Sequence, residues 1–97
     1  RIAVVPVGYA DGFDRRLGNG RWSVLINGHE APTIGRISMD TCAVDVTGLD
    51  VTEGDDVVIF GSRKGHNVAD MAAVLGTIPY EIMTGVSSRV KRIFIKE

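Results

Sequence analysis

The first residues whose types could support chemistry lie in a glycine-rich loop over residues 8–20. The loop opens with Gly8-Tyr9-Ala10-Asp11-Gly12, which has the small residues of a phosphate-binding turn. No helical pattern follows this segment, as a dinucleotide-binding loop would require, so it is a weak phosphate site. On composition alone, the mixed charges of the loop are typical of solvated surface. The charged residues are Asp11, Asp14, Arg15 and Arg16.

Two histidines and one cysteine are the other candidates. Glu30 follows His29, and Asp70 lies near His66. Two possible ligands without a third make no recognisable zinc site, so no metal site is predicted. We expect both histidines in solvated loops, Asp70 in the first turn of a helix, and Cys42 as a small buried thiol. The residues alone complete no catalytic set, whether nucleophile and base, carboxylate dyad or metal cluster.

The composition describes one ordinary globular domain, here residues 1–97, with 44% hydrophobic and 24% charged residues. Lys and Arg number 11 against 12 Asp and Glu, so the basic excess of a nucleic-acid binder is missing. The longest apolar runs are a few residues each, far short of the ~20 that span a bilayer. A single cysteine excludes an internal disulfide framework.

Short β-branched runs broken by glycine turns predict most of the elements that must position these residues. Asn27-Gly28 is a strong hairpin signal between two of these runs. The expected strands are residues 2–7, 22–26, 29–37, 39–46, 57–60 and 89–95.

Two short helices complete the predicted elements. Asn67 can cap a helix that carries Met71 and Leu75 on one face, and Gly76 can end it. Proline is tolerated in a first helical turn, so a second helix is expected over Pro79–Met83. The pattern predicts a mostly β fold, either a sandwich or, as we expect, a small closed β-barrel, Greek-key-like, with two short helices.

Several segments of the chain are similar to one known family. Val7–Gly12 with the following Arg15-Arg16-Leu17, and the segment Ala31–Asp40, closely resemble the C-terminal domain of the alanine racemase family. The segments Pro79–Met83 and Ser88–Arg92 match the tail of that domain. The resemblance runs through essentially the whole chain.

The resemblance implies a C-terminal β-domain that follows an N-terminal (β/α)₈ barrel carrying pyridoxal 5′-phosphate (PLP). Members of the family work as head-to-tail homodimers, in which one subunit's barrel and the other's C-terminal domain share each active site. A barrel lysine and a tyrosine of the partner subunit exchange the Cα proton of a small amino acid, and PLP is the electron sink. The implied product, D-alanine, is a peptidoglycan precursor.

The resemblance leaves the two catalytic residues of the family unmatched. The cofactor lysine belongs to the barrel, and the lysines here match no part of its motif; they are Lys64, Lys91 and Lys96. The catalytic tyrosine lies in a Ser-Tyr-Gly segment that falls upstream of Arg1, so Tyr9 is not the base. We therefore expect the chain to hold no catalytic residue and to be inactive alone.

Residue by residue, the resemblance implies a role in substrate entrance and binding. Tyr9 matches the tyrosine that narrows the inner end of the entrance, and Met39 matches the residue whose backbone N–H meets the substrate carboxylate. Ser88 falls where some members place a tyrosine that touches the PLP phosphate. A serine is shorter, which weakens that contact and enlarges the pocket. The outer entrance is matched by Arg15, Arg36 and Asp40.

The substrate stays open between two amino acids, with alanine favoured and serine, for which Ser88 leaves room, second. Two further interpretations are a non-catalytic β-domain of the same fold and a decarboxylase of the same PLP fold type. We expect this domain in the cytoplasm. Since some serine-racemising relatives carry a membrane region, a membrane-anchored full-length protein also stays open.

Overall fold

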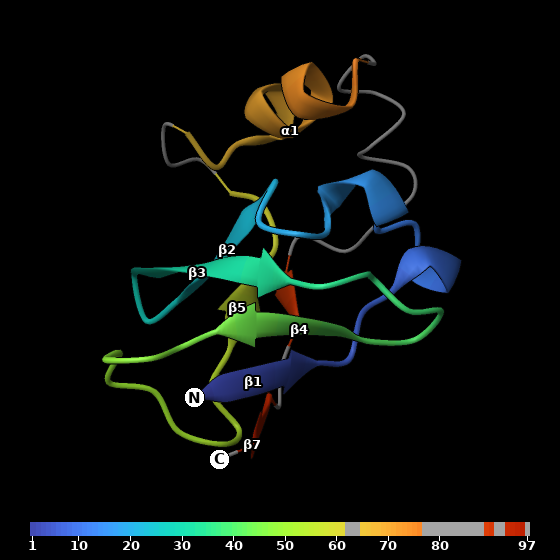
Figure 1. Cartoon of the computed structure of the whole chain (residues 1–97). Coiled ribbons are helices and arrows are strands. Elements are labelled where there is room, and N and C mark those ends of the chain that lie inside the picture. Colours follow the sequence, from blue (N-terminus) through green and yellow to red (C-terminus); the bar gives the residue numbers. More distant parts are fainter. Residues whose placement is uncertain (62–64, 77–88, 91–92, 97) are drawn as a thin grey trace.

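A computed structural model describes residues 1–61, 65–76, 89–90 and 93–96. Within these ranges, seven short strands form one antiparallel sheet that curls into a half-barrel, in the order β6-β5-β2-β3-β4-β1-β7 (Figure 1). The strands are β1 (Ile2–Val5), β2 (Ser23–Ile26), β3 (His29–Ile34), β4 (Cys42–Asp45), β5 (Val57–Val58), β6 (Arg89–Val90) and β7 (Phe94–Lys96). The predicted mostly β, barrel-like fold is confirmed.

The order of the strands is that of a Greek key. β2, β3 and β4 follow one another as antiparallel neighbours, and β1 lies beside β4 rather than beside β2. The connection from β1 to β2 is therefore long, and it carries the glycine-rich loop. Among the described strands the pairings form an open series whose ends are β6 and β7, so the sheet curls without those two strands meeting.

Local sequence explains the central hairpin. Asn27 and Gly28 both have positive φ, 52° and 79°, as a two-residue turn of type I′ requires. In β3 the side chains alternate, with Ala31 and Thr33 buried and their neighbours exposed. One face of the strand thus points into the core, and the predicted hairpin is confirmed.

The helix α1 (Val68–Leu75) has the ends that the sequence predicts. Asn67 caps it by accepting a hydrogen bond from the Asp70 N–H at 2.8 Å, and Asp70 accepts one from the Asn67 N–H at 3.1 Å. Gly76 ends the helix with φ of 68°. The helix lies beyond β2 on the side away from β1, as Figure 1 shows, and buries Met71 and Leu75. The second expected helix, at 79–83, lies outside the described residues.

Two other regions differ from the sequence prediction. The single strand expected over residues 89–95 is two strands, because β6 pairs with β5 while β7 pairs with β1 at the opposite end of the series. The loop over residues 8–20 contains two single 3₁₀ turns, η1 (Tyr9–Asp11) and η2 (Arg15–Leu17). Buried Phe13 and Leu17 attach this loop to the core.

Within the described ranges, every helix is too short or too polar to cross a bilayer.

Candidate functional site

The glycine-rich loop lies directly against the connection between β3 and β4. A Cβ placed on Gly8 would stand 2.2 Å from the Ser38 carbonyl oxygen and 2.4 Å from that of Met39. The φ of Gly8 is −144°, which any residue can adopt, so space rather than backbone conformation requires glycine here. The two segments that carry the family resemblance are therefore in backbone contact.

Hydrogen bonds fix this contact. The Tyr9 N–H donates to the Ser38 carbonyl at 3.0 Å, and the Ala10 N–H donates to the Met39 carbonyl at 2.9 Å. On the loop side, the Gly8 N–H donates to an Asp11 carboxylate oxygen at 3.0 Å. Asp11 thus closes the η1 turn. Composition alone predicts only a solvated surface residue at this position.

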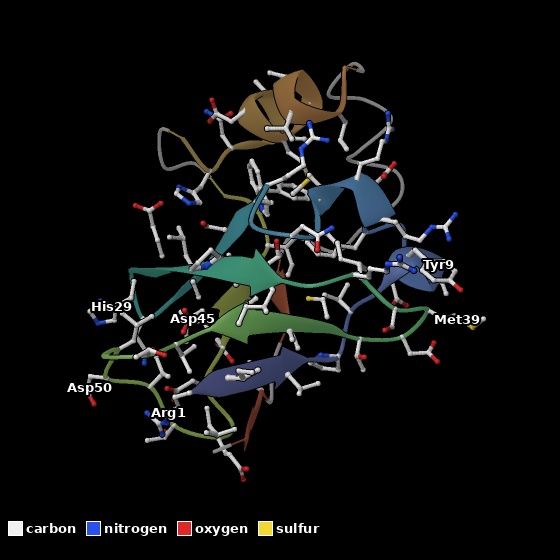
Figure 2. The ribbon with its side chains drawn as sticks, in the orientation of Figure 1. Arg1, Tyr9, His29, Met39, Asp45 and Asp50 are labelled. Carbon is white, nitrogen blue, oxygen red and sulfur yellow. The ribbon has the colours of Figure 1, made fainter. Side chains whose placement is uncertain are left out.

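Tyr9 and Met39 are exposed although the backbone beneath them is fixed. Their exposed fractions are 41% and 54%, and Figure 2 shows both side chains at the same end of the molecule. Within the described part of the chain, the Met39 N–H has no hydrogen-bond acceptor. The Ser38 N–H donates to the Thr41 carbonyl at 2.9 Å, which closes the turn around Met39. This end therefore presents an aromatic ring, a thioether and an unused backbone donor.

Arg15 and Tyr9 are brought together. The guanidinium carbon of Arg15 lies 5.1 Å from the centroid of the Tyr9 ring, which is a cation–π contact. The next residue, Arg16, forms an ion pair with Asp14 at 2.9 Å. This hydrogen-bonded partner holds the pKa of Asp14 below its usual value.

Arg36 and Asp40 are exposed residues on the same connection as Met39. Arg36 follows Gly35, which has φ of 63° and turns the chain out of β3. Buried Ile37 anchors the connection between them. Ser88 lies outside the described residues, as do Lys64 and Lys91, and Lys96 lies in β7.

His66 corrects the prediction that both histidines are solvated. His66 is 7% exposed, and its Nε2 lies 3.2 Å from Oε1 of Glu30. Its ring also packs against Trp22, with centroids 5.8 Å apart. The fold brings β3 next to the segment before α1, a contact that sequence spacing does not reveal. His29 is exposed as predicted.

The His66 side chain borders a hollow that lies between the β2–β3 hairpin and α1. Its volume is about 370 Å³. Within the described residues, no group of three His, Cys, Asp or Glu side chains could hold a metal ion. The residues lining the hollow include Arg21, Trp22, Glu30, His66, Asp70 and Val74.

Cys42 is a buried thiol, as predicted. It lies in β4 opposite Val5 of β1, and burial raises its pKa to about 12. A thiol with that pKa is a poor nucleophile at neutral pH.

The comparisons with known proteins agree with the segments that form this site. Residues 1–94 match the family described as the C-terminal domain of alanine racemase. The chain belongs to this family.

Similar curated proteins are all longer than the chain. It is 51% identical over 98 residues to alanine racemase 1 of Clostridium acetobutylicum, and 44% identical over 96 residues to the alanine racemase of Helicobacter pylori. These matches cover 98% and 97% of the chain but 25% of each relative. The chain thus spans about a quarter of the length of these alanine racemases.

Solved structures agree with the family assignment. Alanine racemase of Clostridium difficile 630 matches with a TM-score of 0.78 and 41% identity, over 89% of this chain and 23% of that one. Alanine racemase of Bartonella henselae with covalently bound pyridoxal phosphate matches with a TM-score of 0.78 and 41% identity, over 97% of this chain and 26% of that one.

The described residues of this alanine racemase domain suit a carboxylate better than PLP. Met39 offers an unused N–H, and Arg15 and Arg36 carry guanidinium groups on the two connections that meet there. Covalent attachment of PLP needs a lysine side chain, and the described side chains include none. The described side chains therefore offer no site for covalently bound PLP.

Proposed function

We propose that residues 1–97 are the C-terminal domain of a PLP-dependent racemase that interconverts L- and D-alanine. Two observations support this activity: the similar proteins are named alanine racemases, and one of them is 51% identical to the chain in sequence. We propose further that an N-terminal barrel domain of the same protein binds PLP, that two subunits form a homodimer, and that the enzyme works in the cytoplasm.

In this proposal the chain supplies the substrate entrance and one substrate contact to the partner subunit's site. The supporting observation is the contact of Gly8 with the Ser38–Met39 backbone, which fixes exposed Tyr9 and the unused Met39 N–H at one end. A substrate carboxylate that accepts this N–H gains a charge-assisted hydrogen bond of about 1.5–3 kcal/mol.

The other residues control the access of substrate to the site. Tyr9 narrows the entrance through its ring and hydroxyl group. Arg15 and Arg36 attract the substrate carboxylate by their positive charge, and Asp40 limits that charge. When bound elsewhere in the protein, PLP supplies the electron sink for loss of the Cα proton. No residue of this chain moves that proton.

The chain alone should fold but should be inactive. Its radius of gyration of 12.1 Å agrees with the ~13 Å of a compact domain of about 100 residues. Mixed with PLP and either enantiomer of alanine, it should give no turnover and bind no stoichiometric lysine-linked PLP. Turnover by the purified chain would contradict the proposal.

Variants of Tyr9 test the entrance in the full-length enzyme. Tyr9→Phe keeps the ring and should leave substantial turnover, because Tyr9 is not the base. Tyr9→Ala should widen the entrance and admit bulkier amino acids. Loss of proton exchange from one enantiomer only in Tyr9→Phe would make Tyr9 the base and refute this assignment.

Variants of Met39 separate its side chain from its backbone. Met39→Ala keeps the N–H, so only a modest rise in KM is expected. Replacing the Met39 amide by an ester in a semisynthetic enzyme deletes the donor with little change of shape, and KM should rise far more. Unchanged substrate affinity in the ester variant would remove Met39 from the binding site.

Serine is the second candidate substrate, because Ser88 stands where some relatives place a tyrosine. The test compares kcat/KM for serine and for alanine in the full-length enzyme and in Ser88→Tyr. A serine racemase should lose relative activity on serine in that variant. Absence of racemisation with both amino acids would favour a non-catalytic β-domain.

A further inference from the structure

The turn η2 directs three consecutive side chains to three different places. A 3₁₀ helix has three residues per turn, so successive side chains are separated by about a third of a turn. Arg15 lies over the Tyr9 ring, and Leu17 is fully buried in the core. Arg16, between them, is directed towards Asp14 and α1. The orientation of η2 therefore decides where the Arg15 guanidinium lies.

Arg16 binds the N-cap residue of its own turn, Asp14, and joins η2 to the end of α1. Its Nε and Nη2 donate to the two carboxylate oxygens of Asp14 at 3.1 and 2.9 Å. Its Nη1 donates to the Leu75 carbonyl at 3.1 Å. Leu75 is the last residue of α1, where carbonyl groups lack partners within the helix and a cation is favourable. The planar guanidinium group of Arg16 thus binds both the Asp14 carboxylate and the Leu75 carbonyl group.

The end of η2 that leads to β2 is held separately. The Leu17 carbonyl accepts a hydrogen bond from Oγ1 of buried Thr33 at 2.7 Å, and the Asn19 N–H donates to the Gly35 carbonyl at 2.8 Å. These bonds fix where η2 lies along β3. The turn is also held by buried Leu17, by the Arg16 N–H, which donates to the Asp14 carboxylate at 2.8 Å, and by the Arg16 side chain, which reaches the end of α1.

We propose that Arg16 is a positioning residue for the substrate entrance. By tying the capped turn η2 to the end of α1, Arg16 holds the Arg15 guanidinium over Tyr9. This inference rests on the proposed function, because Tyr9 and Arg15 line the entrance only if the domain serves a racemase. It adds a residue that lies outside the entrance and acts through Arg15.

A double-mutant cycle in the full-length enzyme tests this role. Arg15→Met and Arg16→Met should each raise KM for alanine about two- to five-fold, the effect expected of an exposed cation–π contact, with kcat almost unchanged. Because Arg16 acts through Arg15, the double variant should show no larger rise than Arg15→Met alone. Arg21→Met, at another exposed arginine of the same connection, is the matched control and should leave KM unchanged.

A spectroscopic measurement reports the geometry without activity. With 3-fluorotyrosine at position 9, Arg15→Met should shift the ¹⁹F resonance, and Arg16→Met should shift it in the same direction. Arg16→Lys keeps the charge but loses the two-pronged contact with Asp14, so it should behave like Arg16→Met.

The outcomes separate the two levels of the proposal. If Arg16→Met lowers only the melting temperature and leaves KM and the ¹⁹F shift unchanged, or if the KM effects of the two arginines multiply, Arg16 is not a positioning residue. If Tyr9→Ala and Arg15→Met themselves leave KM unchanged, the proposed entrance fails instead.

Discussion

The two ends of the half-barrel differ in how their polar groups are used. Figure 2 shows His29 and Asp50 at one end and Tyr9 and Met39 at the other. At the hairpin end, side chains bind one another. Asn27 Nδ2 donates to an Asp55 carboxylate oxygen at 2.9 Å, and the Thr52 N–H donates to the same carboxylate at 2.8 Å. These hydrogen bonds lower the pKa of Asp55, the Thr52 N–H most strongly.

At the Tyr9–Met39 end, backbone hydrogen bonds hold the two connections together, and the Tyr9 and Met39 side chains are exposed. The backbone here is hydrogen-bonded, while the Met39 N–H has no acceptor among the described residues. A rigid backbone under exposed side chains is what a binding site needs, whereas side chains that satisfy one another stabilise a turn. The comparison therefore contrasts an end whose groups bind one another with the end that we propose as the substrate entrance.

The largest difference between the ends should come from their glycines. Gly8→Ala forces a Cβ against two backbone carbonyl groups that cannot yield, and should cost about 3 kcal/mol of unfolding free energy. Gly28→Ala meets open space and only strains a positive φ, costing about 1 kcal/mol. Urea unfolding of the 97-residue chain measures both. Equal losses would mean that the Gly8 contact is not tight.

Two threonines give the next contrast. Buried Thr33 bridges the Leu17 carbonyl and the Gly20 N–H at 2.7 and 3.1 Å, so Thr33→Val should cost about 1–3 kcal/mol. The hydroxyl of exposed Thr47, at the other end, accepts a hydrogen bond from the N-terminal amino group at 2.9 Å. Because water can replace an exposed partner, the Thr47→Val substitution should cost less than the Thr33→Val substitution, about 0.5 kcal/mol. Thermal unfolding of the two variants gives the comparison, and a neutral Thr33→Val would remove the support of η2 by β3.

A smaller effect concerns pH. The folded-state pKa of Asp55 is lowered, so its contribution to stability is present above the unfolded value near 4 and is lost as the pH falls through the folded value. Asp14, on the other connection, has a lowered pKa for a similar reason and should lose its contribution in the same range. The urea midpoint of unfolding should fall less steeply at acid pH in Asp55→Asn and in Asp14→Asn than in the parent chain. An unchanged pH dependence in either variant would argue against the hydrogen bonds of that carboxylate.

Cys42 should give the smallest effect, because it concerns reactivity rather than stability. With a pKa of about 12, the folded thiol is almost entirely protonated at pH 8. Iodoacetamide should therefore modify Cys42 far more slowly in the folded chain than in urea. Equal rates would show that β4 opens readily from β1.

Local rules predicted the parts of the fold that depend on neighbouring residues. Asn27-Gly28 specifies its hairpin and Asn67 with Gly76 specifies the ends of α1, because capping and turn geometry act within a few residues. The pair of His66 with Glu30 was missed, since it joins segments that only the folded sheet brings together. The division of residues 89–95 into two strands was missed because a sequence pattern does not name a strand's partner.

The candidate site shows the same limit. Family resemblance predicts that Tyr9 and Met39 belong to one site, whereas composition alone assigns the loop to solvated surface. The contact of Arg15 with Tyr9 and the link from Arg16 to Leu75 depend on the rotation of a single 3₁₀ turn. No spacing rule encodes that rotation.

The place of β1 inside the sheet has a consequence for how the domain folds. Val4 pairs with Ala43 on one side and with Phe94 on the other, so β1 is held by partners from the middle and from the far end of the sequence. Such non-local pairings slow folding, because loop-closure entropy is lost before the contacts form. The loop that follows β1, with Gly8 and Tyr9, should therefore become ordered late. A nascent or refolding chain should form the β2–β3 hairpin well before it orders the loop of the proposed entrance.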